Sequence, residues 1–66
     1  MLGTITKLQV KKNKPNRSYG FIEGHDGETY WFALRGREDL EIGMDVSFKG
    51  GKNEKGLTAV QVQKVS

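Results

Sequence analysis

The sequence predicts an all-β fold, and two observations lead to this class. Nine glycines and one proline are spread over 66 residues, and turn residues separate short runs in which apolar and polar residues tend to alternate. Runs of this kind are typical of β-strands, and no long stretch has the spacing of an amphipathic helix. A chain of this length forms one domain at most, so we expect a single domain over residues 1–66.

The first two strands are expected over residues 2–10 and 18–23. Apolar residues in the first strand do not alternate strictly, which predicts a bend or a β-bulge; they are Leu2, Ile5, Leu8 and Val10. The segment KKNKPN that follows has a proline, which cannot donate to a ladder, and two asparagines, which favour turns. The second strand leads into GHDG, whose Asp-Gly pair predicts a tight hairpin turn with His25 exposed.

The third strand is expected over residues 28–34, ETYWFAL, and its pleat has two possible assignments. The two faces would carry Tyr30, Phe32 and Leu34 on one side, and Thr29, Trp31 and Ala33 on the other. The first set is the more apolar, so we place it inside and Trp31 outside. A shift by one residue would instead bring Tyr30 and Phe32 to the surface.

Two more strands are expected over residues 44–49 and 57–65. The buried positions of these strands would be Met44, Val46 and Phe48 in the fourth, and Leu57, Ala59, Val62 and Val65 in the fifth. The polar segment RGREDLEIG before the fourth strand has room for one short helical turn. The segment GGKNEKG between the two strands is expected to be a flexible loop.

Five strands in so short a chain would leave exposed edges unless the sheet closes on itself. The five-stranded oligonucleotide-binding (OB) barrel has this size and this number of strands. We therefore predict an all-β, five-stranded antiparallel Greek-key OB-fold barrel. An open meander with one solvated face is the alternative.

Basic residues gather in the N-terminal part of the chain. Eleven Lys and Arg residues stand against eight Asp and Glu residues, a net charge of +3, yet residues 1–17 hold no acid. A basic segment suggests a polyanionic partner, although an ordinary solvated surface explains it equally well. Its members are Lys7, Lys11, Lys12, Lys14 and Arg17.

Other classes of protein find little support in the sequence. The chain has no cysteine, which excludes disulfides and thiolate metal sites and fits a reducing cytosol. No apolar run marks a signal peptide or a membrane span. The single histidine, His25, forms no catalytic triad, and neither glycine-rich segment has the spacing of a phosphate-binding loop. We expect a cytoplasmic monomer with no enzymatic activity, cofactor, metal, membrane association or small-molecule substrate.

The stretch RSYGFIEG puts Tyr19 and Phe21 two residues apart, with only Gly20 between them. In a strand this spacing sends both rings to one face. Ile22 suits the inside of the sheet and Gly20 makes a poor outer face, so we expect both rings outside, with a core position as the alternative. Gly20 is expected to let a neighbouring strand or a base approach closely.

Four segments, in order, resemble the cold-shock domain family. GTITKL is similar to the family's Gly-Thr-Val-Lys-Trp-Phe, and RSYGFI to its first ribonucleoprotein motif, Lys-Gly-Phe-Gly-Phe-Ile. TYWFA is similar to the second such motif, Asp-Val-Phe-Val-His or Asp-Tyr-Phe-Phe-His. LEIGMDVSFKGGKNEKGLTAVQV follows the closing pattern of Gly, Val, Phe, Lys-Gly, Ala and Val. Together these segments span nearly the whole chain.

The resemblance implies a five-stranded barrel that binds single-stranded RNA or DNA without catalysis, as cold-shock RNA chaperones do. It implies Tyr19, Phe21 and Trp31 as stacking rings, with Arg17 as a flanking cation. Two stacking positions of the family are lost, because its first-strand tryptophan falls at Lys7 and its histidine at Ala33. The connection after the third strand lacks a further phenylalanine, and the loop VKKNKPN is long. We therefore expect a narrower aromatic platform.

Rings suit exposed bases and cations suit phosphates, so these residues predict a single-stranded nucleic acid as partner. The expected binding residues are Lys7, Lys12, Arg17, Tyr19, Phe21 and Trp31, with Lys11, Lys14, Tyr30 and Phe32 as further candidates. Stacking predicts weak sequence preference, and the family suggests pyrimidine-rich or U-rich stretches. Two alternatives stay open: a protein-interaction module that uses the same rings, and a translation-factor-like OB module that binds structured RNA on the ribosome.

Overall fold

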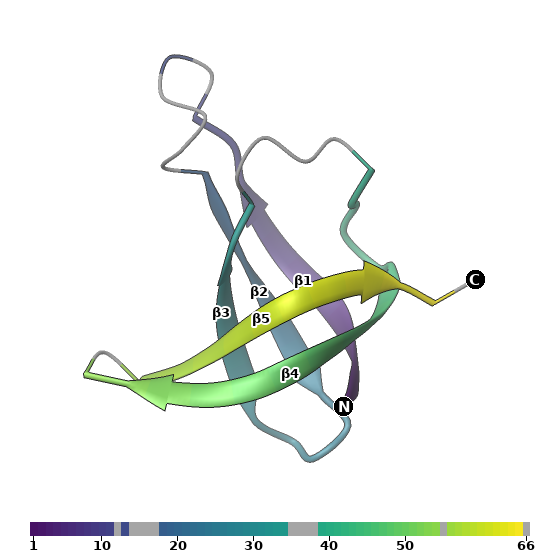
Figure 1. Ribbon diagram of the computed structural model, residues 1–66. Helices are drawn as coiled ribbons and strands as arrows, with labels where there is room; N and C mark the ends of the chain where they lie inside the picture. The colour runs from purple at the N-terminus through teal and green to yellow at the C-terminus, as the bar shows by residue number, and fades with distance from the viewer. Residues whose placement is uncertain (12, 14–17, 35–38, 55, 66) are drawn as a thin grey trace.

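Five strands make up most of the chain in the computed structural model, which describes residues 1–11, 13, 18–34, 39–54 and 56–65. The strands are β1 (Leu2–Gln9), β2 (Tyr19–Gly24), β3 (Thr29–Ala33), β4 (Asp45–Asn53) and β5 (Gly56–Lys64) (Figure 1). No helix occurs in these described ranges. The predicted all-β class is confirmed.

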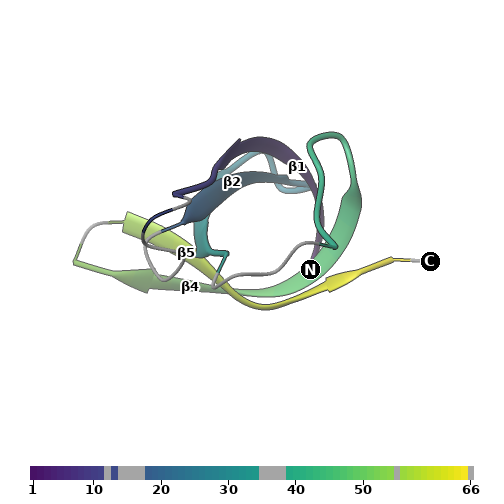
Figure 2. The same cartoon turned by 90° about the horizontal axis from the view of Figure 1, so that it is seen from above.

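The strands form one closed sheet in the order β1-β2-β3-β5-β4, with β4 pairing back onto β1. Figure 2 shows them surrounding a common interior. The prediction of a closed sheet is confirmed, but the prediction of a purely antiparallel one is wrong, because β3 and β5 are parallel, with Trp31 opposite Thr58. A ring with an odd number of strands cannot alternate direction at every step, so at least one pair must be parallel.

The predicted irregularity in β1 is a register shift between Ile5 and Lys7 against β2. Ile5 is fully buried and Leu8 packs against the core, although the two positions are three apart in sequence. Simple alternation would put them on opposite faces. The bulge resets the pleat, so that both point inward while Lys7 stays exposed.

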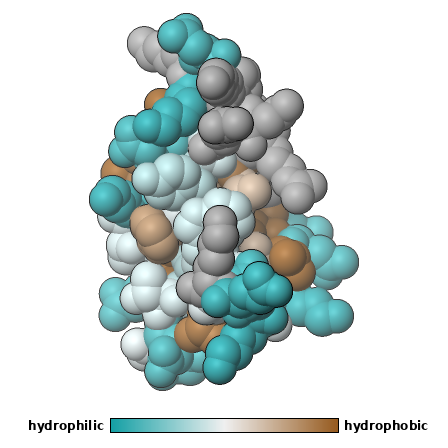
Figure 3. Space-filling view, turned by 90° about the vertical axis from the view of Figure 1, so that its left-hand side faces the viewer, coloured by the Kyte–Doolittle hydropathy of each residue, from teal (hydrophilic) through white to brown (hydrophobic). Residues whose placement is uncertain are grey.

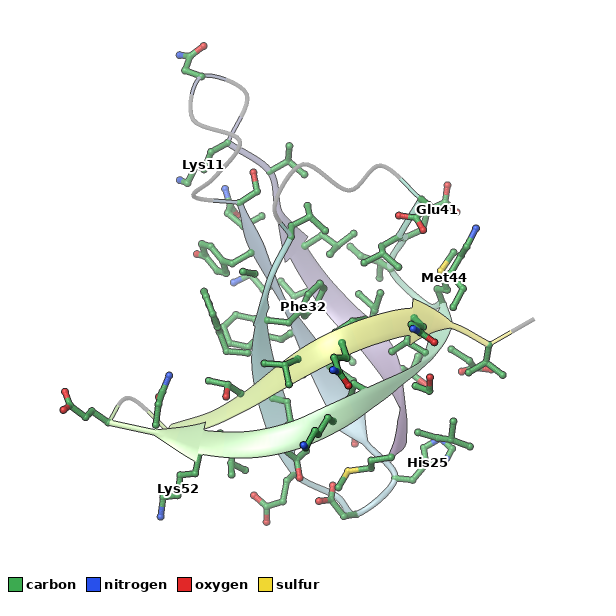
Figure 4. The ribbon with its side chains drawn as sticks, in the orientation of Figure 1. Lys11, His25, Phe32, Glu41, Met44 and Lys52 are labelled. Carbon is green, nitrogen blue, oxygen red and sulfur yellow. The ribbon has the colours of Figure 1, made fainter. Side chains whose placement is uncertain are left out.

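The interior is filled from all five strands and from the connection before β4. The buried core residues are Ile5, Ile22, Tyr30, Phe32, Leu34, Leu40, Val46, Phe48, Ala59 and Val62. Figure 4 shows Phe32, which is 1% exposed, pointing into this interior. The β3 pleat is therefore the one assigned from its apolar face, with Trp31 outside at 40% exposure. The shifted register, with Tyr30 and Phe32 at the surface, is wrong.

The prediction of a flexible loop over GGKNEKG is wrong for most of that segment. β4 continues to Asn53, and residues 50–53 pair with residues 56–59 of β5. Gly50 lies in this strand opposite Ala59, and a Cβ there would lie 3.1 Å from Cε2 of Tyr30. Its missing side chain lets β4 cross close to that buried ring, whereas Gly56 takes a positive φ of 125° at the turn.

Val65, predicted as a buried position, is 48% exposed. The cause is a second register shift, between Ser47 and Lys49 of β4, where β5 has one extra residue. Gln61 sits at this bulge with a φ of 55°. The bulge brings Val62 to the inside, and the alternation that follows turns Val65 outward.

The GHDG turn is a tight hairpin, as predicted, with a hydrogen bond from the Gly27 N–H to the Gly24 carbonyl of 3.0 Å. Asp26 ties this turn to the core. The Tyr30 hydroxyl donates to Asp26 Oδ2 at 2.6 Å, and the Glu28 N–H donates to Oδ1 at 3.1 Å. The hydrogen bond from Tyr30 is the main cause that holds the pKa of Asp26 below its ordinary value of 3.8. The same bond raises the pKa of Tyr30 above its ordinary 10.0.

We predict that replacing Gln61 by glycine stabilises the protein. The left-handed conformation costs a residue with a Cβ roughly 1–2 kcal/mol, and glycine loses only about 0.5–1 kcal/mol of this gain to chain entropy. The free energy of unfolding in urea should therefore rise by about 0.5–1 kcal/mol. Gln63→Gly, two residues further along the same strand, is the matched control and should destabilise. A fall in stability for Gln61→Gly would contradict the strained bulge.

We also predict a specific acid dependence from the pair of Asp26 and Tyr30. The folded-state pKa of Asp26 lies below 3.8, so the stability from this pair is present above pH 3.8 and is lost as the pH falls further. The raised pKa of Tyr30 means a second loss above pH 10.0. The difference in unfolding free energy between wild type and Asp26→Asn should shrink on acidification below pH 3.8. The difference in unfolding free energy between wild type and Tyr30→Phe should also shrink on acidification below pH 3.8. A difference that stays constant in both variants would contradict the assignment.

Candidate nucleic-acid interface

The outer face of β1, β2 and β3 carries the predicted rings in a regular arrangement. Every second residue of a strand points outward, and the pairing aligns these residues across the three strands. Three rows result: Gln9–Tyr19–Ala33, Lys7–Phe21–Trp31 and Thr4–Glu23–Thr29. None of the nine is buried. Figure 3 views the molecule from the side of β3 and the hairpin tip, where residues of intermediate hydropathy lie between hydrophilic ones.

Three rings form one group on this face, which we call the aromatic cluster: Tyr19, Phe21 and Trp31. Tyr19 meets Phe21 edge to face with ring centroids 5.9 Å apart. It meets Trp31 nearly in parallel, at 6.3 Å and an interplanar angle of 24°. Tyr19 and Phe21 are half-buried, so the alternative of a core position is wrong for both. The structure thus brings together the three rings that the sequence singled out.

Gly20 allows β1, β2 and β3 to pack closely beneath the aromatic rings. A Cβ at this position would lie 2.7 Å from Leu8 Cδ2, from the Lys7 carbonyl oxygen and from Phe32 Cε1. The space inside β2 is therefore taken by β1 and by the core ring of β3. The expected close approach is confirmed for the neighbouring strand, and it holds β1, β2 and β3 together beneath the aromatic cluster.

The structure places two of the predicted cations. Lys7 is exposed in the same row as Phe21 and Trp31. Lys11 is exposed just after β1, where its backbone N–H donates to the Ser18 hydroxyl at 2.8 Å. Figure 4 shows Lys11 at the end of the molecule opposite to His25. Lys12, Lys14 and Arg17 lie outside the described residues.

A groove adjoins the aromatic cluster on the side of the β4–β5 hairpin. It measures about 750 Å³, and its lining residues are Phe21, Thr29, Trp31, Asn53, Glu54, Leu57 and Thr58. The parallel pair of Trp31 and Thr58 positions the hairpin beside β3. Two of the lining residues, Asn53 and Glu54, fall in the segment predicted as a flexible loop. Thr29, Leu57 and Thr58 fall in predicted strands but are not among the predicted site residues. The sequence Asn-Glu-Lys-Gly between two alternating runs was the signal that could have found the hairpin. Lys52, on the same hairpin, is a further exposed cation (Figure 4).

Two of the further candidates drop out of the site. Tyr30 and Phe32 are 5% and 1% exposed, with Tyr30 packed against Phe48 at a centroid distance of 4.9 Å.

The described residues hold no group of three His, Asp or Glu side chains able to bind a metal. Within the same residues there is no helix of the length and apolar character needed to cross a membrane.

Comparison with models of known protein families and with curated protein sequences gave no match to this chain.

Proposed function

We propose that this protein is an OB-fold domain of the cold-shock type that binds single-stranded RNA or DNA. The aromatic cluster carries the proposal: Tyr19 contacts both Phe21 and Trp31, and the three rings are partly open to solvent on one face with Lys7. The strand number and the closed sheet fit the five-stranded OB barrel, whose ligands lie over strands 2 and 3. The segments that resemble the two ribonucleoprotein motifs fall on β2 and β3.

Unpaired bases present flat apolar faces that a duplex hides in its stack. A base placed on Phe21 or Trp31 gains about 1–3 kcal/mol by the usual effect of alanine substitution. The phosphates of the same strand lie within reach of Lys7 and Lys11, which are exposed beside the rings. The domain therefore binds the open form of a hairpin in preference to its paired form. Mass action then shifts the hairpin toward the open strand, which is the action of an RNA chaperone.

The role needs neither catalysis nor a cofactor, and the partner is a strand and not a small molecule. Stacking contacts every base by its face, so most positions of the bound strand carry little sequence preference. A monomer suffices, because one domain supplies both the rings and the cations.

The test of the proposal is a titration with a uridine heptamer while Trp31 fluorescence is followed. Trp31 is the single tryptophan of the chain, so its emission reports on the aromatic cluster alone. We expect quenching and a dissociation constant in the micromolar range or below. If about three phosphates are neutralised, the logarithm of affinity should fall with the logarithm of salt at a slope near −2.

A blunt-ended duplex of the same length is the control, and it should bind more weakly at equal salt. Unchanged emission with high micromolar strand would contradict nucleic-acid binding. It would leave a protein partner as the occupant of the aromatic cluster.

We predict that Phe21→Ala weakens heptamer binding by about 1–3 kcal/mol while the domain stays folded. Phe32→Ala is the matched control, because it removes the same ring from the opposite face of the same three-strand layer. This variant should lose about 3–5 kcal/mol of stability, since Phe32 is fully buried. The unfolding free energies of both variants separate the two roles. A stability loss at Phe21 as large as that at Phe32 would show that its ring serves the core.

A further inference from the structure

The outer face of β1–β3 is polarised in charge. Lys11 lies at the end of the face where β1 finishes, and Lys7 lies in the middle row. At the other end the third row carries Glu23, and Glu28 directly precedes β3. Glu54 lines the groove near the same row, on a hairpin that also carries the exposed Lys52. On β1–β3 themselves, phosphates are attracted to the first end and repelled from the second. In the proposed complex, the bound strand therefore has its backbone toward Lys7 and Lys11, and the edges of its bases point toward Glu23.

Glu23 is in line with the rings. Tyr19, Phe21 and Glu23 are alternate residues of β2, so their side chains leave the same face, each about 6.6 Å from the next. Thr29 is the cross-strand partner of Glu23, as Trp31 is that of Phe21. A base stacked in the middle row thus presents its edge to the carboxylate of Glu23 and the hydroxyl of Thr29. Both side chains are exposed, and the carboxylate of Glu23 makes no hydrogen bond or ion pair with any described residue.

The chemistry of a carboxylate decides which edge it accepts. An ionised carboxylate has two acceptor oxygens and no donor, so it requires N–H groups on the base. Guanine offers two adjacent donors on its Watson–Crick edge, the ring N1–H and the N2 amino group, and these match the two oxygens side by side. Cytosine and adenine each offer one amino group. Uracil offers one N–H between two carbonyl oxygens, and both oxygens repel the carboxylate.

We propose that Glu23 reads the Watson–Crick edge of one base in the bound strand and that this position prefers guanine. The inference rests on the proposed function and adds one selective position to a surface that is otherwise tolerant of sequence. Thr29, the cross-strand partner of Glu23, lines the neighbouring groove, whose 750 Å³ falls within the range of about 300–1,000 Å³ for ligand sites. Thr29 and Thr58 line it with hydroxyls that can donate or accept.

The experiment compares three strands of equal length and charge: a uridine heptamer, the same heptamer with a central guanosine, and the same with a central inosine. Inosine keeps N1–H but lacks the N2 amino group. Binding is followed by the anisotropy of a dye on the strand, since guanine itself alters tryptophan emission. We expect the guanosine strand to bind at least about fivefold more tightly than the uridine heptamer, with the inosine strand between them.

In Glu23→Gln, the guanosine and uridine strands should bind within about twofold of one another, because the amide keeps only one acceptor. Glu28→Gln is the matched control, since it removes one negative charge from the same end of the face. It should keep the guanosine preference. Loss of preference in this control, to the extent seen in Glu23→Gln, would assign the effect to overall charge and overturn the inference.

Equal binding of all three strands by the wild type would overturn the inference while leaving the proposed function intact. Tighter binding of the uridine heptamer would do the same. Absence of any anisotropy change, together with unchanged Trp31 emission, would instead refute nucleic-acid binding itself. The two failures are therefore distinguishable in one set of titrations.

Discussion

A ring of five strands cannot alternate in direction at every step, and the position of its one parallel pair shapes the rest of this molecule. β1, β2 and β3 are successive antiparallel neighbours, and β4 and β5 form a long hairpin that must fill the gap between β1 and β3. The parallel contact falls between Trp31 and Thr58. It brings the end of the hairpin beside the aromatic cluster. Closure of the sheet and formation of the groove are thus consequences of the same pairing.

The two faces of the three-strand layer divide stability from recognition. Inside, Ile22, Tyr30 and Phe32 belong to the core, and each fully buried apolar side chain contributes about 1.5–3 kcal/mol. Outside, Tyr19, Phe21 and Trp31 keep part of their surface in water. A domain of 66 residues has little core to spare. Rings held outside such a core bury apolar surface fully only when a ligand covers them, which agrees with the proposed role in binding.

Charge completes the arrangement on the outer face. In the proposed complex, the stacking rings treat all bases alike, whereas the cations at one end of β1–β3 and the acids at the other give the face a direction. Under this proposal, the direction orients the sugar–phosphate backbone away from Glu23 and turns base edges toward it. Orientation is the condition for reading an edge at all, so the distribution of charge decides more here than the net charge of +3 does.

Much of the fold, and the centre of the candidate site, followed from the sequence because they depend on local patterns. The alternation of apolar and polar residues predicted Trp31 outside and Phe32 inside. The interruption of this alternation between Ile5 and Leu8 predicted the bulge in β1. The Asp-Gly pair marked the hairpin turn. These features involve residues that are neighbours along one strand or one turn, and their side chains report their own surroundings.

Only the tertiary structure decided the rest, because it depends on which distant segments meet. Gly50 looked like part of a loop, and its place in β4 becomes clear only beside the ring of Tyr30, twenty residues away. Leu40 enters the core from a polar connection, and Val65 is turned out by a bulge at Gln61. The groove, in the same way, exists because Trp31 and Thr58 pair across the point of closure. The sequence alone determined which side of each central strand is apolar; the closing of the ring determined which surfaces stand side by side.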